Sequence, residues 1–150
     1  MQTMRGDLWG MHGEGHWVCV TTNGVVGSSG LVMGAGIAKE AAIRYPELKA
    51  HWGDGVMKHG NVPMCYIPGR LLSFPTKHHW RHPSDLPLIQ SSAKKLVEWW
   101  TFVEAWYKMS GEEPKPICLP KPGCGNGGLL WSQVEPAISG MLNDNFIVML

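Results

Sequence analysis

The 150-residue sequence predicts an α/β protein in which a mixed sheet lies between helices. Short apolar segments alternate along the chain with segments whose apolar residues recur at helical spacing. Two glycine-rich loops each follow a short apolar segment and precede a helix. A hydrophobic content of 44% and a formal charge of +1 are ordinary for a globular domain, so we expect one domain over residues 1–150.

The first half of the chain holds five predicted elements. They are strands over residues 4–9 and 16–22, helices over residues 34–44 and 47–52, and a hairpin over residues 64–75. The first strand contains Asp7, although carboxylates usually avoid strands. Pro46 separates the two helices, and Pro68 with Gly69 forms the turn of the hairpin.

Four more elements follow. They are a helix from Ser84 to about Met109, a strand over residues 116–120, a helix over residues 130–142 and a strand over residues 146–150. Ser84 is the expected N-cap of the long helix, with Asp85 in its first turn. The helix carries Ile89, Ala93 and Leu96 at helical spacing, which predicts that one face packs on the sheet.

Charge and composition exclude several classes of protein. The near-neutral charge gives no broad attraction to nucleic acid or to a membrane, and no apolar run is long enough to cross a bilayer. The N-terminus lacks the apolar core of a signal peptide. The four cysteines show no CxxC spacing, so we expect reduced thiols in a cytoplasmic protein.

Glycines are concentrated where a helix begins, at Gly30, Gly34 and Gly36 in the stretch GLVMGAGIA and at Gly27 just before it. A helix N-terminus presents unpaired N–H groups and favours negative charge, which indicates a phosphate site. Tight turns are the alternative. The second loop, PGCGNGG, has the same arrangement, and two such loops in one small domain favour a ligand held from two sides.

The second loop also satisfies G-x-G-x-x-G at Gly123, Gly125 and Gly128. Too little chain follows it for a dinucleotide-binding fold, and the Walker pattern is absent. Phosphate binding would therefore use backbone amides without a P-loop lysine.

The segment SFPTKHHWRHPSD is dense in cations. It forms either a solvated basic loop or a cationic rim beside a phosphate or a ribose. Lys77 directly follows a strand, and a desolvated lysine can attack the aldehyde carbon of a sugar. No metal is expected, because no cysteine or acidic partner completes a ligand set with His78, His79, His82, His12 and His16.

Two further side chains have two interpretations each. Asn23, at a strand end, can bind a ligand hydroxyl or cap its own turn. Cys124 has no histidine beside it in sequence, so packing is favoured over a nucleophilic role.

Taken together and in order, GDLW, TTNG, GLVMGAGIA, FPTKHHWRHPSD and LPKPGCGNGGLLW resemble a macrodomain over nearly the whole chain. The similarity is to the branch that contains the antitoxin DarG and the human terminal ADP-ribose glycohydrolase. It implies a three-layer αβα fold with a mixed central sheet, which binds ADP-ribose at the strand ends and needs no cofactor.

The resemblance also implies roles for individual residues. Asp7 would meet the adenine amine, with Leu8 and Leu150 near the ring. Lys77 would attack C1″ of the distal ribose, and Asn23 would contact that ribose and assist catalysis. The backbone that would hold the diphosphate and the distal ribose comprises Met33, Gly34, Ala35, Gly36, Ile37, Gly123, Cys124, Gly125, Asn126, Gly127 and Gly128.

The implied activity is removal of ADP-ribose from a modified nucleobase in single-stranded DNA, or from an acidic side chain of a protein. Dephosphorylation of ADP-ribose 1″-phosphate and non-catalytic reading of ADP-ribose are the alternatives. The sequence departs from the branch at Gly127, where the human enzyme has an aspartate, and at Leu130, where DarG-like chains often have one. We expect a monomer without the toxin-binding domain of DarG.

Overall fold

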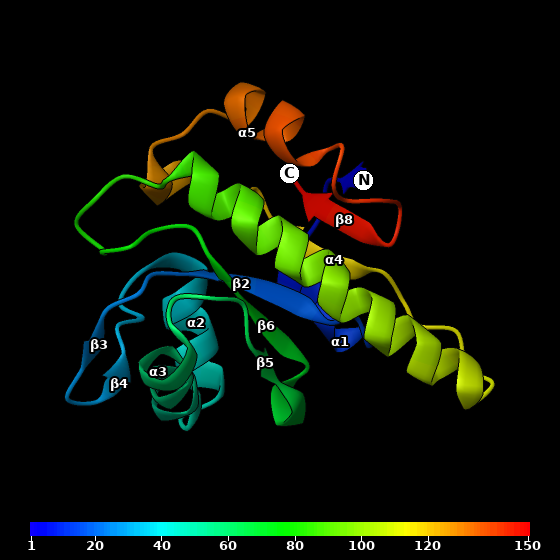
Figure 1. The fold of residues 1–150 in the computed structure, drawn as a ribbon, viewed down its shortest axis with the longest axis horizontal. Helices are drawn as coiled ribbons and strands as arrows, with labels where there is room; N and C mark the ends of the chain where they lie inside the picture. Colours follow the sequence, from blue (N-terminus) through cyan, green and yellow to red (C-terminus); the bar gives the residue numbers. More distant parts are fainter.

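The structure is a computed structural model that describes residues 1–150. Six strands form one mixed sheet in the order β1-β8-β7-β2-β6-β5 (Figure 1). These are β1 (Gln2–Met4), β2 (Val18–Thr22), β5 (Cys65–Tyr66), β6 (Leu71–Pro75), β7 (Ile117–Pro120) and β8 (Phe146–Met149). Only β5 is antiparallel to its neighbour, so the carboxyl ends of five strands meet at one edge of the sheet.

Helices cover both faces of this sheet. One face carries α1 (Leu8–Gly13), α2 (Gly36–Arg44) and α3 (Leu48–His59), and the other carries α4 (Leu86–Met109) and α5 (Trp131–Ile138). Along β2, Val18 and Val20 pack toward the first group and Cys19 packs toward the second, as strand alternation requires. The predicted αβα layering is confirmed, and Figure 1 shows α4 running across one face.

The prediction for residues 4–9 was wrong. Strand β1 ends at Met4, and Asp7 is the N-cap of α1 rather than a strand residue. Its carboxylate accepts a hydrogen bond from the Gly10 N–H at 3.1 Å. Aspartate is a preferred N-cap because it satisfies one of the unpaired donors of the first turn.

Helix α3 extends to His59 instead of ending near Trp52. It packs on a small hairpin, β3 (Val26–Gly27) and β4 (Gly30–Leu31), which was not predicted. A Cβ at Gly30 would overlap the Lys49 carbonyl oxygen, and one at Gly53 would lie 2.9 Å from the Leu31 nitrogen. These two glycines therefore permit close packing of α3 and are not part of a ligand site.

The remaining elements follow the predictions with small shifts. The hairpin of residues 64–75 is confirmed as the antiparallel pair β5–β6, closed by a 3₁₀ turn over Ile67–Gly69. The long helix is confirmed, although Asp85 rather than Ser84 is its N-cap. Helix α5 ends at Ile138, four residues before the predicted end.

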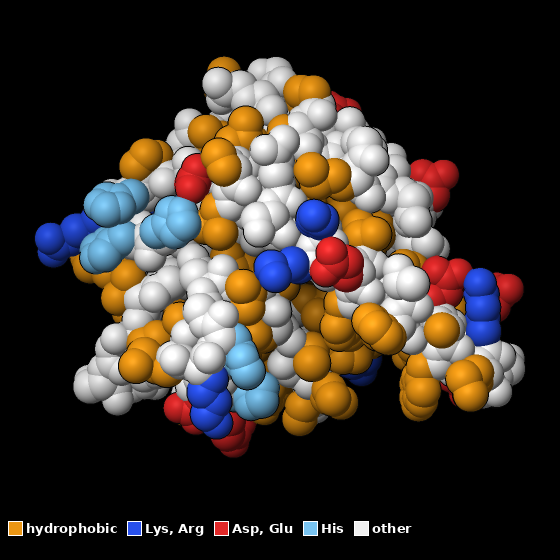
Figure 2. All heavy atoms as spheres, viewed as in Figure 1, with side chains coloured by type: hydrophobic (Ala, Val, Ile, Leu, Met, Phe, Trp, Pro, Cys, Tyr) orange, Lys and Arg blue, Asp and Glu red, His pale blue; other side chains and the backbone are white.

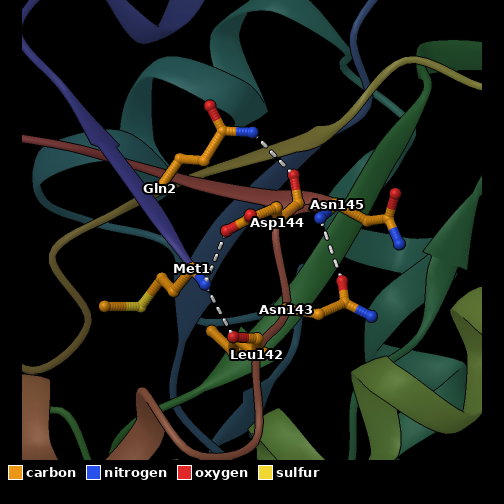
Figure 3. Close-up of polar contacts among 6 residues, drawn as sticks. All are labelled: Met1, Gln2, Leu142, Asn143, Asp144 and Asn145. Atoms are coloured by element: carbon orange, nitrogen blue, oxygen red, sulfur yellow. Dashed lines mark hydrogen bonds and ion pairs between the residues drawn. The ribbon is translucent and has the colours of Figure 1, made fainter.

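The first and last strands lie side by side. Strand β1 pairs in parallel with β8, and the Met1 ammonium group donates to the Leu142 carbonyl at 2.9 Å and to the Asp144 carboxylate at 3.2 Å (Figure 3). The Gln2 amide donates to the Asp144 carbonyl at 2.8 Å. No helix combines the length and the apolar character that crossing a membrane would require.

Candidate functional site

A cavity of about 650 Å³ lies beyond the carboxyl ends of β2, β6 and β7. Its walls include both predicted glycine-rich loops, together with Asn23, Lys77 and Lys121, which follow these three strands. The volume is typical of small-molecule sites. Open α/β sheets generally bind their ligands beyond the carboxyl ends of the strands, which is where this cavity lies.

The first loop presents a run of unpaired backbone donors. The N–H groups of residues 33–38 have no acceptor within the protein, and the first bond after them joins the Lys39 N–H to the Ala35 carbonyl at 3.2 Å. Ala35 is the N-cap of α2 and supplies no side-chain cap. The cavity wall therefore combines free N–H groups with the positive end of a helix, which suits an anion.

The second loop has three more N–H groups without a protein acceptor, two of them on residues that line the cavity. The N–H groups of Gly123, Gly125 and Asn126 have no protein acceptor, while the loop is closed by a bond from the Leu129 N–H to the Gly123 carbonyl at 3.0 Å. A Cβ on Gly36 would lie only 3.6 Å from the Asn126 amide nitrogen. The two loops thus approach each other over the cavity.

Lys77 lies just after the central strand β6, and its side chain reaches the second loop. Its Nζ donates to the Asn126 carbonyl at 3.1 Å, and its own carbonyl accepts from the Asn61 amide at 3.0 Å. No aspartate or glutamate lines the cavity, whose only charged lining side chains are Lys77 and Lys121. The cavity is therefore electropositive, with a primary amine held at one wall.

Asn23 lines the cavity and also caps its own turn. Its amide nitrogen donates to the Val32 carbonyl at 2.9 Å, and its amide oxygen accepts from the Val25 N–H at 2.9 Å. The capping interpretation is thus confirmed for the structure. These bonds fix the first loop relative to the end of β2.

Ser84 and Gly127 form a tight contact at the base of the second loop. The Ser84 N–H donates to the Gly127 carbonyl at 2.9 Å, and a Cβ on Gly127 would overlap the Ser84 oxygen. That hydroxyl oxygen is buried and has no hydrogen-bond partner. The absence of a side chain at position 127 is therefore a packing requirement of this chain.

No model of a known protein family matches the chain. Among solved structures, the macrodomain of Thermus aquaticus DarG superposes with a TM-score of 0.69 at 25% identity, over 99% of this chain and 97% of that one. The chain belongs to the macrodomain family. Thermosipho africanus DarTG in complex with ADP-ribose gives a TM-score of 0.72 at 25% identity, over 99% of this macrodomain and 40% of that chain.

Curated relatives agree with this assignment. The DNA ADP-ribosyl glycohydrolase of Mycobacterium tuberculosis is 32% identical over 114 residues, which is 69% of this macrodomain. The protein of that name from Thermus aquaticus is 36% identical over 75 residues, or 50% of this chain. The matched segments span only 30% and 18% of the lengths of these relatives.

The fold brings most of the predicted site residues together. Those that line the cavity are Asn23, Met33, Gly34, Ala35, Gly36, Ile37, Lys77, Gly123, Cys124, Asn126 and Gly127. Gly125 and Gly128 belong to the same loop but do not line it. Asp7, Leu8 and Leu150 also lie outside it, after β1 and β8 on the same sheet edge, and the Leu150 N–H donates to the Met4 carbonyl at 2.8 Å.

Several lining residues were not predicted. Thr22 and Thr76 end or follow central strands, a position that a strand-by-strand search of the sequence can identify. Trp80 and Ser84 come from the segment between β6 and α4, and only the fold brings them to the cavity. The complete set missed is Thr21, Thr22, Val32, Ala38, Thr76, Trp80, Ser84, Pro120 and Lys121.

The thiol of Cys124 lines the cavity, and burial raises its pKa, an effect that Lys121 partly opposes. A raised pKa disfavours the thiolate, in agreement with the packing interpretation. Among the histidines, His12 and His16 contact the carbonyls of Gly69 and Pro116. No cluster of three or more histidine, cysteine or acidic side chains suits a metal ion.

Proposed function

We propose that this macrodomain is an ADP-ribosyl hydrolase that removes ADP-ribose from a modified nucleobase in single-stranded DNA. The observation that carries the proposal is the cavity, in which two loops of unpaired backbone N–H groups flank a fixed lysine amine. The similar DNA ADP-ribosyl glycohydrolases of Thermus aquaticus and Mycobacterium tuberculosis supply the substrate class.

In the proposed complex, the diphosphate accepts hydrogen bonds from residues 33–38 and from the second loop. The distal ribose lies beside Asn23 and Lys77. The adenine extends along the sheet edge toward β8 and β1, where Asp7, Leu8 and Leu150 follow the strand ends. Preorganised amides would hold C1″ close to the amine and so reduce the entropic cost of attack.

The proposed nucleophile is Lys77 Nζ. As its bond to C1″ forms, the bond between C1″ and the base nitrogen breaks, and the base leaves with a proton. The ribose ring then opens to a Schiff base with the lysine. Water adds to the imine carbon, and ADP-ribose leaves as the free amine is restored.

The test is a panel of substrates incubated with the wild-type protein: an ADP-ribosylated single-stranded oligonucleotide, an ADP-ribosylated protein with acidic acceptor sites, and ADP-ribose 1″-phosphate. We expect release of ADP-ribose from the oligonucleotide. Binding of ADP-ribose without turnover of any substrate would identify a reader, and turnover of the phosphate alone would identify a phosphatase.

We also propose that residues 1–150 act as one macrodomain and as a monomer. The six-stranded sheet, with helices on both faces, supports a unit that folds by itself. The four free cysteines fit a reducing compartment.

A further inference from the structure

The loop between β6 and α4 has a fixed base and a tip that contributes nothing to the core. At the base, the Thr76 N–H donates to the Thr22 carbonyl at 3.0 Å and the Asp85 N–H donates to the Thr76 carbonyl at 2.9 Å. At the tip, the His82 N–H donates to the His79 carbonyl at 3.1 Å, which closes a local turn. Figure 2 shows histidine and other basic side chains gathered at the end of the molecule where Figure 1 places this loop.

Trp80, at this tip, lines the mouth of the cavity and is 45% exposed. It belongs to neither hydrophobic core. An indole left at the surface forgoes the stabilisation that burial would give. Trp80 is therefore not held by core packing, and part of its indole is accessible beside the cavity.

The neighbours of Trp80 are cationic or aromatic. The Arg81 guanidinium lies 4.7 Å from the centre of the indole, and the His79 ring stacks on it at 5.3 Å. Arg81 pairs with no carboxylate, whereas the one acidic side chain of the loop, Asp85, is paired with His78 at 2.7 Å. An aromatic ring beside an unneutralised cation is the combination that binds single-stranded nucleic acid, through base stacking and phosphate attraction.

We propose that Trp80 and Arg81 bind the nucleotide next to the ADP-ribosylated base, with the flanking base stacking on the indole in place of the His79 ring and its phosphate on the guanidinium. The proposal rests on the proposed function, since it requires a modified nucleic acid in the cavity. Trp80 follows Lys77 by three residues and shares the cavity with it, so a base leaving C1″ has its neighbours at this tip. A protein substrate would offer neither a stacking base nor a regularly placed phosphate.

Binding measurements test this contact independently of turnover. In a Lys77→Ala background, which leaves the substrate intact, the dissociation constants of an ADP-ribosylated single-stranded oligonucleotide and of free ADP-ribose are compared. We expect tighter binding of the oligonucleotide. Trp80→Ala should reduce that advantage by between about fivefold and about a hundredfold, the usual contribution of one stacked base, and Trp80→Phe should retain most of it.

Trp106→Ala is the matched control, because Trp106 is 65% exposed on α4 and does not line the cavity. It should leave the advantage intact. Arg81→Gln should reduce the slope of log affinity against log salt concentration for the oligonucleotide by about one, the change expected when one phosphate contact is lost.

Three results would overturn the proposal. They are equal affinity for the oligonucleotide and for ADP-ribose, an equal loss of both affinities in Trp80→Ala, or the same Trp80-dependent advantage for an ADP-ribosylated peptide. The proposed function is judged separately, by whether the wild-type protein cleaves the same oligonucleotide. A Trp80-dependent advantage without cleavage would refute hydrolysis and leave the nucleotide contact established.

Discussion

Gly127→Ala should destabilise the empty protein, although the residue lies in a loop at a ligand cavity. The new Cβ would overlap the Ser84 oxygen and lie 3.1 Å from the Ser84 Cβ. Ser84 is only 7% exposed, and its N–H is bonded to the Gly127 carbonyl, so the two residues cannot move apart freely. The backbone of Gly127 is not in the left-handed region, so the cost comes from overpacking and not from strain.

Overpacking typically costs about 1–3 kcal/mol. For a domain of this length, each kcal/mol lowers the melting temperature by about 2–4 °C, so Gly127→Ala should melt about 2–12 °C below the wild type. Ser84→Ala removes a buried hydroxyl without a partner and should not destabilise the protein. The double variant should recover most of the loss, with a coupling energy of about 1 kcal/mol or more.

Thermal and urea unfolding followed by circular dichroism measure both effects. Gly34→Ala is the control, because a Cβ at that position meets no atom within 4 Å. The overpacking explanation is refuted if Gly127→Ala has the same melting temperature as the wild type. It is also refuted if the double variant melts no higher than Gly127→Ala alone.

Three other predictions concern ligand and pH. Gly34→Glu should abolish ADP-ribose binding in calorimetry while the melting temperature stays native, and normal binding would show that the first loop does not hold the diphosphate. Lys77→Ala and Lys77→Arg should both bind ADP-ribose with a dissociation constant on the order of micromolar, but neither should release ADP-ribose from a modified oligonucleotide. Hydrolysis by Lys77→Arg would exclude an imine intermediate, because a guanidinium stays protonated. Burial raises the pKa of Cys118 to about 11 and that of Cys19 further still. The unfolded chain loses these protons first, so the free energy of unfolding should fall as the pH rises from about 9 towards 11, and a smaller fall is expected in Cys118→Ala.

The parts of the fold that local sequence determines were predicted well. The long helix α4 follows from apolar residues at helical spacing, among them Ile89 and Leu96, and the structure buries both. The two glycine-rich loops were found because helix starts and glycines have a local pattern. Both loops line the cavity.

The errors arise where distant residues decide the conformation. Gly53 and Gly55 argue locally against a helix beyond Trp52, but Gly53 permits contact with the β4 backbone, which outweighs its low helix propensity. Aspartate favours an N-cap, yet Asp7 was predicted to lie in a strand. The error arose because β1 has only three residues, too few to show where the alternating pattern of a strand ends. Trp80 could not be placed at the cavity, since its position depends on how the segment after β6 returns to α4.

The parallel pairing of β1 with β8 has a consequence for synthesis on the ribosome. Residues 2–4 leave the exit tunnel long before residues 146–149, which form the only strand that pairs with them. The nascent chain therefore exposes an unpaired strand while the sequence between β1 and β8 is translated. Since Asp7 and Leu8 lie a few residues after β1, the part of the molecule that we assign to adenine takes its final place only once β8 has formed, when the loops and Lys77 can already be in place.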